Sequence, residues 1–395
     1  MAKRQCADCG GESVYHGVEY TAVLLDILFL PVFSLLLDRM LYPALGRPGG
    51  TSSLTARLYA ALVYARLGIF LDEPDDKTLL LDQVLWQEAK RRGIGMREFR
   101  LLGTPNNTFV ATLPGGKTIA FYGIPPMPAK APAWWINNKS ILKKKLGALG
   151  VPVPRGGSVF RLPAAQKIFN TIDRALITKP AIGSASRHTT MHIKNKEELK
   201  TAFASAKKVS PFVIVEEELR GCVYRPTLVG GTLIATLRRD QPFVVGNGTN
   251  TVEQLVEEEN KNPKRGGPYF SPIVLNKAAD AELRLQGHTR DSIPPMGRRV
   301  QLHPKINWAV GGTTTDVTDE VHPENAALFE RVAEILGLSL VGIDFIIEDI
   351  SRPWHEQPGC GVIECNDMPF FDNHHLPFKG EPRDIAGPVW DLVTP

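Results

Sequence analysis

The 395-residue sequence is poor in cysteine, in net charge and in long uninterrupted hydrophobic runs. Its five cysteines are an odd number spread over both ends of the chain, which excludes a disulfide framework and indicates a reducing, cytoplasmic compartment. A net charge of +4 at pH 7 is small for this length and points to no nucleic-acid partner. With 43% hydrophobic and 22% charged residues, the chain is expected to be a soluble globular protein of two or three domains.

The most apolar segment, residues 20–45, is interrupted too often to predict stable membrane insertion. Asp26, Pro31 and Asp38 fall within it, whereas a spanning helix needs about 20 residues that are nearly free of charge. A signal peptide is disfavoured because the segment starts late and contains an acidic residue. We expect a core or subunit-contact segment, which leaves a homodimer open, with a helix on the membrane surface as the alternative.

Two short features, the basic runs and a cysteine pair, resemble binding motifs, but their context favours no binding role. The basic runs at 90–92 and 143–145 have no interleaved aromatic residues, so they are expected to be solvated helix faces and not nucleic-acid contacts. Cys6 and Cys9 have the spacing of a zinc or redox pair, but a structural zinc site needs four ligands. His16 is a third candidate ligand, and the sequence supplies no second cysteine pair.

Three oxygen-bearing side chains in two apolar segments predict a metal site. Glu364 and Asn366 are two positions apart at 362–366, so on a strand they point to the same face. Asp344, in the apolar segment 341–347, is a third ligand from a neighbouring strand. Hard oxygen ligands suit Mg²⁺ that is shared with substrate phosphates, which favours an ATP-using enzyme. The alternative is a set of buried polar residues that pair with the backbone.

The pattern along the chain predicts three parts. Residues 1–130 are expected to form an N-terminal α/β module, with helices at 54–67 and 77–92, a strand at 107–113 and a Pro-rich linker at 124–132. Residues 131–210 open with a helix at 139–149, which ends at Gly150 before a Val-Pro-Val-Pro stretch. Residues 211–395 contain the segments that carry the metal ligands.

Several ordered segments resemble those of ATP-grasp ligases, in particular the ATP-grasp domain of cyanophycin synthetase and related amino-acid ligases. They are residues 244–255, 291–300, 311–325, 342–344 and 364–369. The resemblance runs from about residue 138 to the C-terminus and leaves the first 130 residues outside it. It implies an α/β (α+β) ATP-grasp fold, with the nucleotide held between two α+β subdomains, and ATP and Mg²⁺ as cofactors.

The same resemblance assigns Asp344, Glu364 and Asn366 as magnesium ligands, in agreement with the strand argument. It matches Lys139 and Lys179 to lysines that contact ATP phosphates, where cations offset about four negative charges. The loop at 183–190 matches a glycine-rich flap over the phosphates, although it keeps one glycine where several are usual. The flap residues that the resemblance assigns to the nucleotide are Gly183, Ser184 and Arg187.

Further positions follow from the resemblance. Glu216, Glu217 and Glu218 match the hinge that holds adenine; the carboxylate that often holds the ribose falls on Val223, so that Glu217 or Glu218 is left to replace it. Other positions match groups that bind phosphates, the activated carboxylate or the incoming amine, for which an arginine fork is well suited. These are Arg225, Arg239, Arg299, Asn307, Gly311 and Gly312.

The implied reaction joins a small carboxylate to an amino acid. ATP phosphorylates the carboxylate, the amine attacks the acyl phosphate, and amide, ADP and phosphate result, with the Gly311 and Gly312 amides stabilising the oxyanion. The chain stops at Pro395, soon after the ATP-grasp segments, so one amide bond per substrate is expected and not a polymer. Two alternatives stay open: a natural-product ligase that phosphorylates an enol or keto oxygen, as in mycosporine-glycine formation, and a nucleotide-binding regulator with degraded chemistry.

Overall fold

The computed structural model describes residues 4–6, 13–18, 20–21, 23–25, 53–128, 135–136, 138–182, 187–267 and 269–394. Most of the apolar segment at 20–45 therefore lies outside the described residues, as do Gly183 and Ser184 of the expected flap. Within the described ranges, no helix has the length and apolar character needed to cross a membrane.

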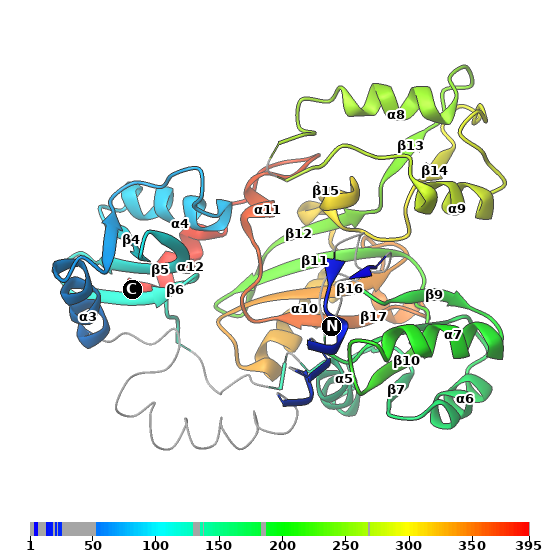
Figure 1. Cartoon of the computed structure of the whole chain (residues 1–395), viewed down its shortest axis with the longest axis horizontal. Helices are drawn as coiled ribbons and strands as arrows, with labels where there is room; N and C mark the ends of the chain where they lie inside the picture. The colour runs from blue at the N-terminus through cyan, green and yellow to red at the C-terminus, as the bar shows by residue number, and fades with distance from the viewer. Residues whose placement is uncertain are drawn as a thin grey trace.

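The first lobe is a four-stranded antiparallel sheet covered by helices (Figure 1). Its elements are α3 (Ser53–Tyr64), β3 (Gly68–Leu71), α4 (Leu80–Arg91), β4 (Gly95–Leu101), β5 (Thr104–Thr112) and β6 (Thr118–Tyr122), with the strands in chain order across the sheet. Helix α4 buries Leu81, Leu85 and Ala89, which recur every four residues and therefore line one face. The helices expected at 54–67 and 77–92 correspond to α3 and α4.

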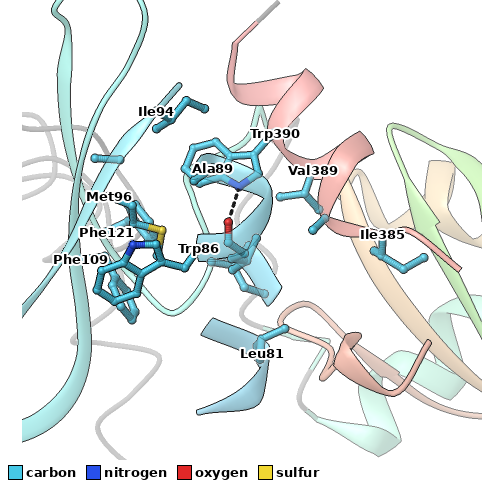
Figure 2. Close-up of a cluster of buried hydrophobic side chains, with 14 of the residues drawn as sticks. Leu81, Trp86, Ala89, Ile94, Met96, Phe109, Phe121, Ile385, Val389 and Trp390 are labelled. Atoms are coloured by element: carbon cyan, nitrogen blue, oxygen red, sulfur yellow. Dashed lines mark hydrogen bonds between the residues drawn. The ribbon is translucent and has the colours of Figure 1, made fainter. Parts of the chain in front are cut away.

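The end of the chain packs into this first lobe. Helix α12 (Ala386–Val393) places Trp390 in the core that α4 and the sheet build, and its indole Nε1 donates a hydrogen bond to the Leu85 carbonyl at 3.0 Å (Figure 2). Phe121 of β6 meets the same indole edge to face at 6.3 Å. The first lobe thus contains the last helix of the chain, which the expected division at residue 130 assigned to a different part.

The central lobe is a second four-stranded antiparallel sheet with the order β7-β10-β8-β9. Its elements are β7 (Gly156–Val159), α6 (Leu162–Thr171), β8 (Leu176–Pro180), β9 (Thr190–Ile193), α7 (Lys196–Ala206) and β10 (Val213–Glu217). Val213 and Val215 of β10 face the core beneath α6 and α7, so Ile214 and Glu216 point to the opposite face. The expected boundary at 210/211 falls before β10, yet β10 lies inside this sheet, which extends the central lobe to Glu217.

The largest sheet has five antiparallel strands in the order β15-β12-β11-β16-β17. Its elements are β11 (Cys222–Val229), β12 (Thr232–Asp240), β15 (Thr313–Asp316), α10 (Pro323–Leu336), β16 (Leu340–Ile347) and β17 (Gly361–Asn366). Val341, Ile343 and Phe345 of β16 share a core with α10 and with α5 (Lys139–Ala148). Because strand residues alternate, Gly342 and Asp344 point to the other face of the sheet.

A small lobe is inserted between β12 and β15 (Figure 1). It comprises β13 (Phe243–Val245), α8 (Val252–Asn260), α9 (Lys277–Leu285) and β14 (Arg299–Gln301) around its own core. Thr251 and Gln254 form a reciprocal capping box at the start of α8, which fixes where that helix begins. The remaining elements are β1 (Arg4–Gln5), β2 (Ser13–Val14), η3 (Trp308–Val310), η4 (Thr318–Glu320), η5 (Trp354–Glu356) and α11 (Asp372–His375).

Candidate active site

Glu216 lies between two lysines on the polar face of the central sheet. Lys179 Nζ is 2.5 Å from one carboxylate oxygen of Glu216, and Lys143 of α5 pairs with the other. Lys179 stands opposite Ile214 in the strand register, so it reaches Glu216 as a diagonal neighbour on the same face. Burial by itself would raise the pKa of Glu216, but the two ammonium groups outweigh burial and lower it.

Lys143 corrects an expectation, because the run at 143–145 was expected to be solvated. Its side chain is buried, with the residue 8% exposed, and burial together with the nearby Lys179 ammonium lowers the pKa of Lys143 to about 7. A signal was present in the sequence: Lys139 and Lys143 are four residues apart, which places them on the same side of a helix.

Asp344 lies between two arginines on the five-stranded sheet. Arg225 donates to both carboxylate oxygens, from Nε at 2.6 Å and from Nη2 at 2.8 Å, and Arg239 Nη1 is 3.4 Å from Oδ1. The three residues come from neighbouring strands β11, β12 and β16, so the sheet itself brings them together. Burial would raise the pKa of Asp344, which is 6% exposed, but the two guanidinium groups outweigh burial and lower it.

The other two expected metal ligands lie next to Asp344 on β17. Glu364 stands directly opposite Asp344 in the antiparallel register and Asn366 opposite Gly342, so the three side chains share a face. Gly342 leaves room here, because a Cβ would approach Arg225 Cδ to 3.2 Å and Pro369 Cβ to 2.8 Å. Lys139 at the start of α5 reaches the Glu364 carboxylate at 3.6 Å.

These residues fit a magnesium ion as a donor set. Two carboxylates and one amide supply the hard oxygen atoms that Mg²⁺ prefers. The amide nitrogen of Asn366 is buried and has no hydrogen-bond partner among the described residues. No hydrogen bond from this nitrogen therefore fixes the orientation of the side chain. Asp344 differs from the other two ligands because its oxygens already accept guanidinium hydrogen bonds.

Two of the glutamates expected at the nucleotide hinge connect strands within the central lobe. Glu217 accepts hydrogen bonds from the Arg155 backbone N–H at 2.9 Å and from its guanidinium. Glu218 accepts from the His192 N–H at 2.9 Å and pairs with the imidazole of the same residue, which raises the pKa of His192. Val223 lies two positions before Arg225 on β11 and therefore points to the face that carries Asp344.

Three expected site residues lie in a turn before β15. The Gly311 N–H donates to the Trp308 carbonyl at 2.9 Å, and the Gly312 N–H donates to the Asn307 carbonyl at 3.1 Å. The side chain of Asn307 accepts from the Ala309 N–H at 3.0 Å, which caps η3. Both glycine N–H groups thus donate inside the turn in this structure. Their expected role at an oxyanion remains a prediction.

Arg299 contacts a different side of the sheet from Arg225 and Arg239. Its guanidinium donates to Asp240 at 2.9 Å and lies 3.6 Å above the Phe243 ring. Asp240 follows Arg239 directly on β12, and consecutive strand residues point to opposite faces. Arg187 lies in the turn before β9.

Of the expected site residues, the structure brings together Lys139, Lys179, Glu216, Arg225, Arg239, Asp344, Glu364 and Asn366. It adds Lys143, which the sequence analysis missed.

A cavity of about 390 Å³ opens beside the Glu216 cluster. Its lining includes Lys143 of α5, Gly156 of β7 and Glu216 of β10. Gly156 has a φ of +142°, and a Cβ there would lie 2.2 Å from the Val215 carbonyl oxygen, so glycine is required where β7 passes β10. The volume is within the range of small-molecule sites.

No family model matches the chain. Over 262 residues it is 37% identical to cyanophycin synthetase from Nostoc sp., an alignment that covers 65% of this chain and 29% of that protein. Over 323 residues it is 28% identical to the glutathione biosynthesis bifunctional protein GshAB from Clostridium perfringens, covering 80% of this chain and 41% of that protein. The crystal structure of a bifunctional glutathione synthetase from Pasteurella multocida superposes with a TM-score of 0.61 at 27% identity, over 81% of this chain and 44% of the other.

The fold is an ATP-grasp fold. The expected resemblance to ATP-grasp ligases and the expected fold class are confirmed. The likeness to the glutathione proteins also extends further than expected, because 80% of the chain is more than residues 138–395 can supply, so it reaches into the first lobe. The chain spans less than half the length of each of these relatives.

Proposed function

We propose that this ATP-grasp chain is an ATP-dependent, ADP-forming ligase that joins a small carboxylate to an amino acid through an acyl phosphate. The observation that carries the proposal is the position of helix α5 between two charged clusters. Lys139 contacts Glu364 of the five-stranded sheet, and Lys143, one helical turn later, contacts Glu216 of the central sheet. One helix face thus joins the candidate metal ligands to the lysine cluster.

The lysines would bind the phosphates of ATP. A triphosphate brings about four negative charges, and Lys139, Lys143 and Lys179 supply three ammonium groups from two elements. Glu364 and Glu216 hold these ammonium groups by ion pairs. When ATP binds, phosphate oxygens would replace those carboxylates as partners. The ion pairs thus keep the lysines near the expected phosphate positions before ATP binds.

Asp344, Glu364 and Asn366 would hold magnesium, which neutralises charge on the transferring phosphoryl group when bound with ATP. Arg225 and Arg239 present guanidinium donors on the same face, suited to the carboxylate of the substrate. A substrate carboxylate oxygen attacks the γ-phosphorus, the bond to the bridging oxygen breaks and ADP leaves. The amine nitrogen then attacks the acyl carbon, the bond to phosphate breaks, and the nitrogen releases a proton to phosphate or solvent.

The relatives support the substrate class. The relatives that align with most of this chain beyond the first lobe are a cyanophycin synthetase and a glutathione biosynthesis protein. These names favour an amino acid as the amine partner.

The four cysteines in the described ranges are free thiols, which suits a reducing cytoplasmic compartment. The homodimer remains a prediction.

The experiment is turnover with pools of substrates. The purified chain is incubated with ATP, Mg²⁺, carboxylates and amino acids, and both ADP release and product mass are followed. We expect ADP release that requires a carboxylate and an amine together, with a new mass equal to their sum minus water. Glu364→Gln should reduce the rate at least about a hundredfold with an unchanged melting temperature, whereas the exposed control Glu334→Gln on α10 should not change it.

Two outcomes would contradict the proposal. ATP binding without ADP release under any pool would favour a nucleotide-binding regulator. Full activity of Glu364→Gln would remove the magnesium assignment, because the loss of a ligand to the metal is expected to slow phosphoryl transfer.

A further inference from the structure

Three side chains of types that can bind metals, two from the N-terminal segment and one from the turn before β9, converge beside the central lobe. Cys6 follows β1, His16 follows β2, and His188 lies in the turn before β9. Cys6 Sγ is 3.7 Å from His188 Nε2, and His16 Nε2 is 3.1 Å from the same nitrogen. All three ligand atoms lie within 4.8 Å of one another. Cys6 and His16 lie outside the expected site residues, whereas His188 lies in the loop 183–190 that was expected to form the flap, one residue after Arg187.

The spacing of these atoms matches a tetrahedral zinc centre. Zn–N bonds of about 2.0–2.1 Å and a Zn–S bond of about 2.3 Å give ligand separations of roughly 3.3 Å for two nitrogens and roughly 3.6 Å for nitrogen and sulfur. The distances of 3.1 Å and 3.7 Å in the structure are close to these values. The imidazoles of His16 and His188 meet edge to face at 86°, an arrangement in which both Nε2 atoms can face one point.

His188 is positioned as a metal ligand would be. It is 1% exposed and has a φ of +52°, an uncommon backbone conformation for a residue with a side chain. Its other ring nitrogen, Nδ1, lies 3.1 Å from the Ser205 hydroxyl of α7. Donation from Nδ1–H to this hydroxyl leaves the Nε2 lone pair directed at Cys6 and His16, which is how outer hydrogen bonds orient histidine ligands.

A hydrogen bond between the two imidazoles is the simpler explanation, but it accounts for less. It explains the 3.1 Å distance between His16 and His188 if one nitrogen is protonated and the other is not. It does not explain why a cysteine sulfur lies against the same Nε2 at 3.7 Å. One cation shared by a thiolate and two neutral imidazoles explains all three positions.

We propose that Cys6, His16 and His188 bind Zn²⁺. A thiolate with two imidazoles favours zinc over magnesium or calcium, which prefer oxygen ligands. Binding displaces the thiol proton of Cys6 to solvent and leaves one tetrahedral position that water can fill. The metal fastens the β1–β2 hairpin to the turn before β9, so it joins the N-terminal segment to the central lobe.

The test is metal content of the full chain purified without chelator. We expect about one zinc per chain by mass spectrometry, and a Co²⁺-substituted sample with the strong visible bands and thiolate charge-transfer band of tetrahedral coordination. Cys6→Ser and His188→Asn should each reduce bound zinc at least about tenfold, as expected when a ligand is lost. Cys360→Ser and His355→Gln, which change the same residue types outside the cluster, should retain it.

Zinc should also raise the melting temperature of the parent chain after chelation, and raise it less in Cys6→Ser, because a ligand that binds the folded state stabilises it. Unchanged zinc content in both ligand variants would overturn the proposal. If a variant fails to fold, the cobalt spectrum of the parent decides: the absence of a thiolate charge-transfer band excludes Cys6 as a ligand.

Discussion

Glu216 and Asp344 are two buried carboxylates, each held between two cations, but the two clusters are built differently. Asp344, Arg225 and Arg239 come from neighbouring strands of one sheet, so strand register alone brings them together. Glu216 and Lys179 come from the central sheet, whereas Lys143 comes from α5, which packs against the five-stranded sheet. The first cluster belongs to one lobe, and the second depends on how two lobes meet.

The cations differ as well. An arginine keeps its charge at any accessible pH and holds a carboxylate with a planar fork, while a lysine is a mobile charge that can lose its proton when buried. Burial and Lys179 lower the pKa of Lys143 to about 7, so the lysine cluster is sensitive to pH near neutrality. A rigid arginine pair suits the orientation of a carboxylate, and mobile lysines suit phosphates that arrive and leave.

The largest expected effect is at the arginine cluster. Asp344→Asn leaves two buried guanidinium groups without their shared anion, and we expect the free energy of unfolding to fall by about 3–5 kcal/mol. Turnover should fall at least about a hundredfold, since a metal ligand is also lost. Urea unfolding measures the first effect. The exposed control Asp76→Asn should remain within about 0.5 kcal/mol of the parent, and an equally small change in Asp344→Asn would show that the arginines do not depend on this carboxylate.

Asp82 offers the opposite case, a carboxyl group without a cation. It is 1% exposed, both of its oxygens lack hydrogen-bond partners among the described residues, and burial, with Glu98 and Asp372 nearby, raises its pKa to about 7. A raised pKa means that the folded state keeps the proton, so stability is highest below the unfolded pKa near 4 and is lost as pH rises through 7.

Asp82→Asn removes this titration and should therefore stabilise the fold at pH 8 by about 2–4 kcal/mol relative to the parent, with little difference at pH 4. Urea unfolding at both pH values measures the effect. A difference between variant and parent that stays constant from pH 4 to pH 8 would mean that Asp82 titrates normally in the folded chain.

The lysine cluster should make ATP affinity depend on pH. Because the lowered pKa leaves Lys143 protonated below about 7 and neutral above it, affinity for the anionic nucleotide should fall as pH rises from 6.5 to 8.5, by at most about tenfold per pH unit. Lys143→Met should bind ATP more weakly at pH 6.5 and lose this slope. Calorimetric titration in parent and variant separates the lysine from ATP itself, and identical slopes in the two proteins would exclude Lys143 as the cause.

The smallest effect is expected at Val223, on the same sheet face as Arg225. Without a carboxylate at this position the chain should discriminate little between ATP and 2′-deoxy-ATP, because an unpaired hydroxyl contributes less than the usual 0.5 to about 1.5 kcal/mol. Val223→Glu should favour ATP by about three- to tenfold in competition binding. Glu217 and Glu218 already pair with Arg155 and His192. Strong discrimination in the parent would nevertheless mean that one of them reaches the ribose.

Local patterns in the sequence determined much of the active-site face. Two-residue spacing placed Glu364 and Asn366 on the same side of a strand, and the structure sets both beside Asp344 across one register. Helical spacing located α3 and α4, and the ordered segments indicated the ATP-grasp fold through their resemblance to known ligases. These features depend on neighbours along the chain or on motifs with fixed spacing, so they can be recognised without knowing what lies across the fold.

Tertiary structure alone decided the rest, because burial depends on packing partners that are distant in sequence. The four-residue spacing places Lys143 on the same side of α5 as Lys139, but only the approach of the central sheet to α5 buries it against Glu216. Trp390 enters the first lobe from the far end of the chain to bond Leu85. His188 lies 172 positions from His16 in the sequence but next to it in the fold. The sequence alone therefore offered Cys6, Cys9 and His16 as candidate ligands and could not indicate His188.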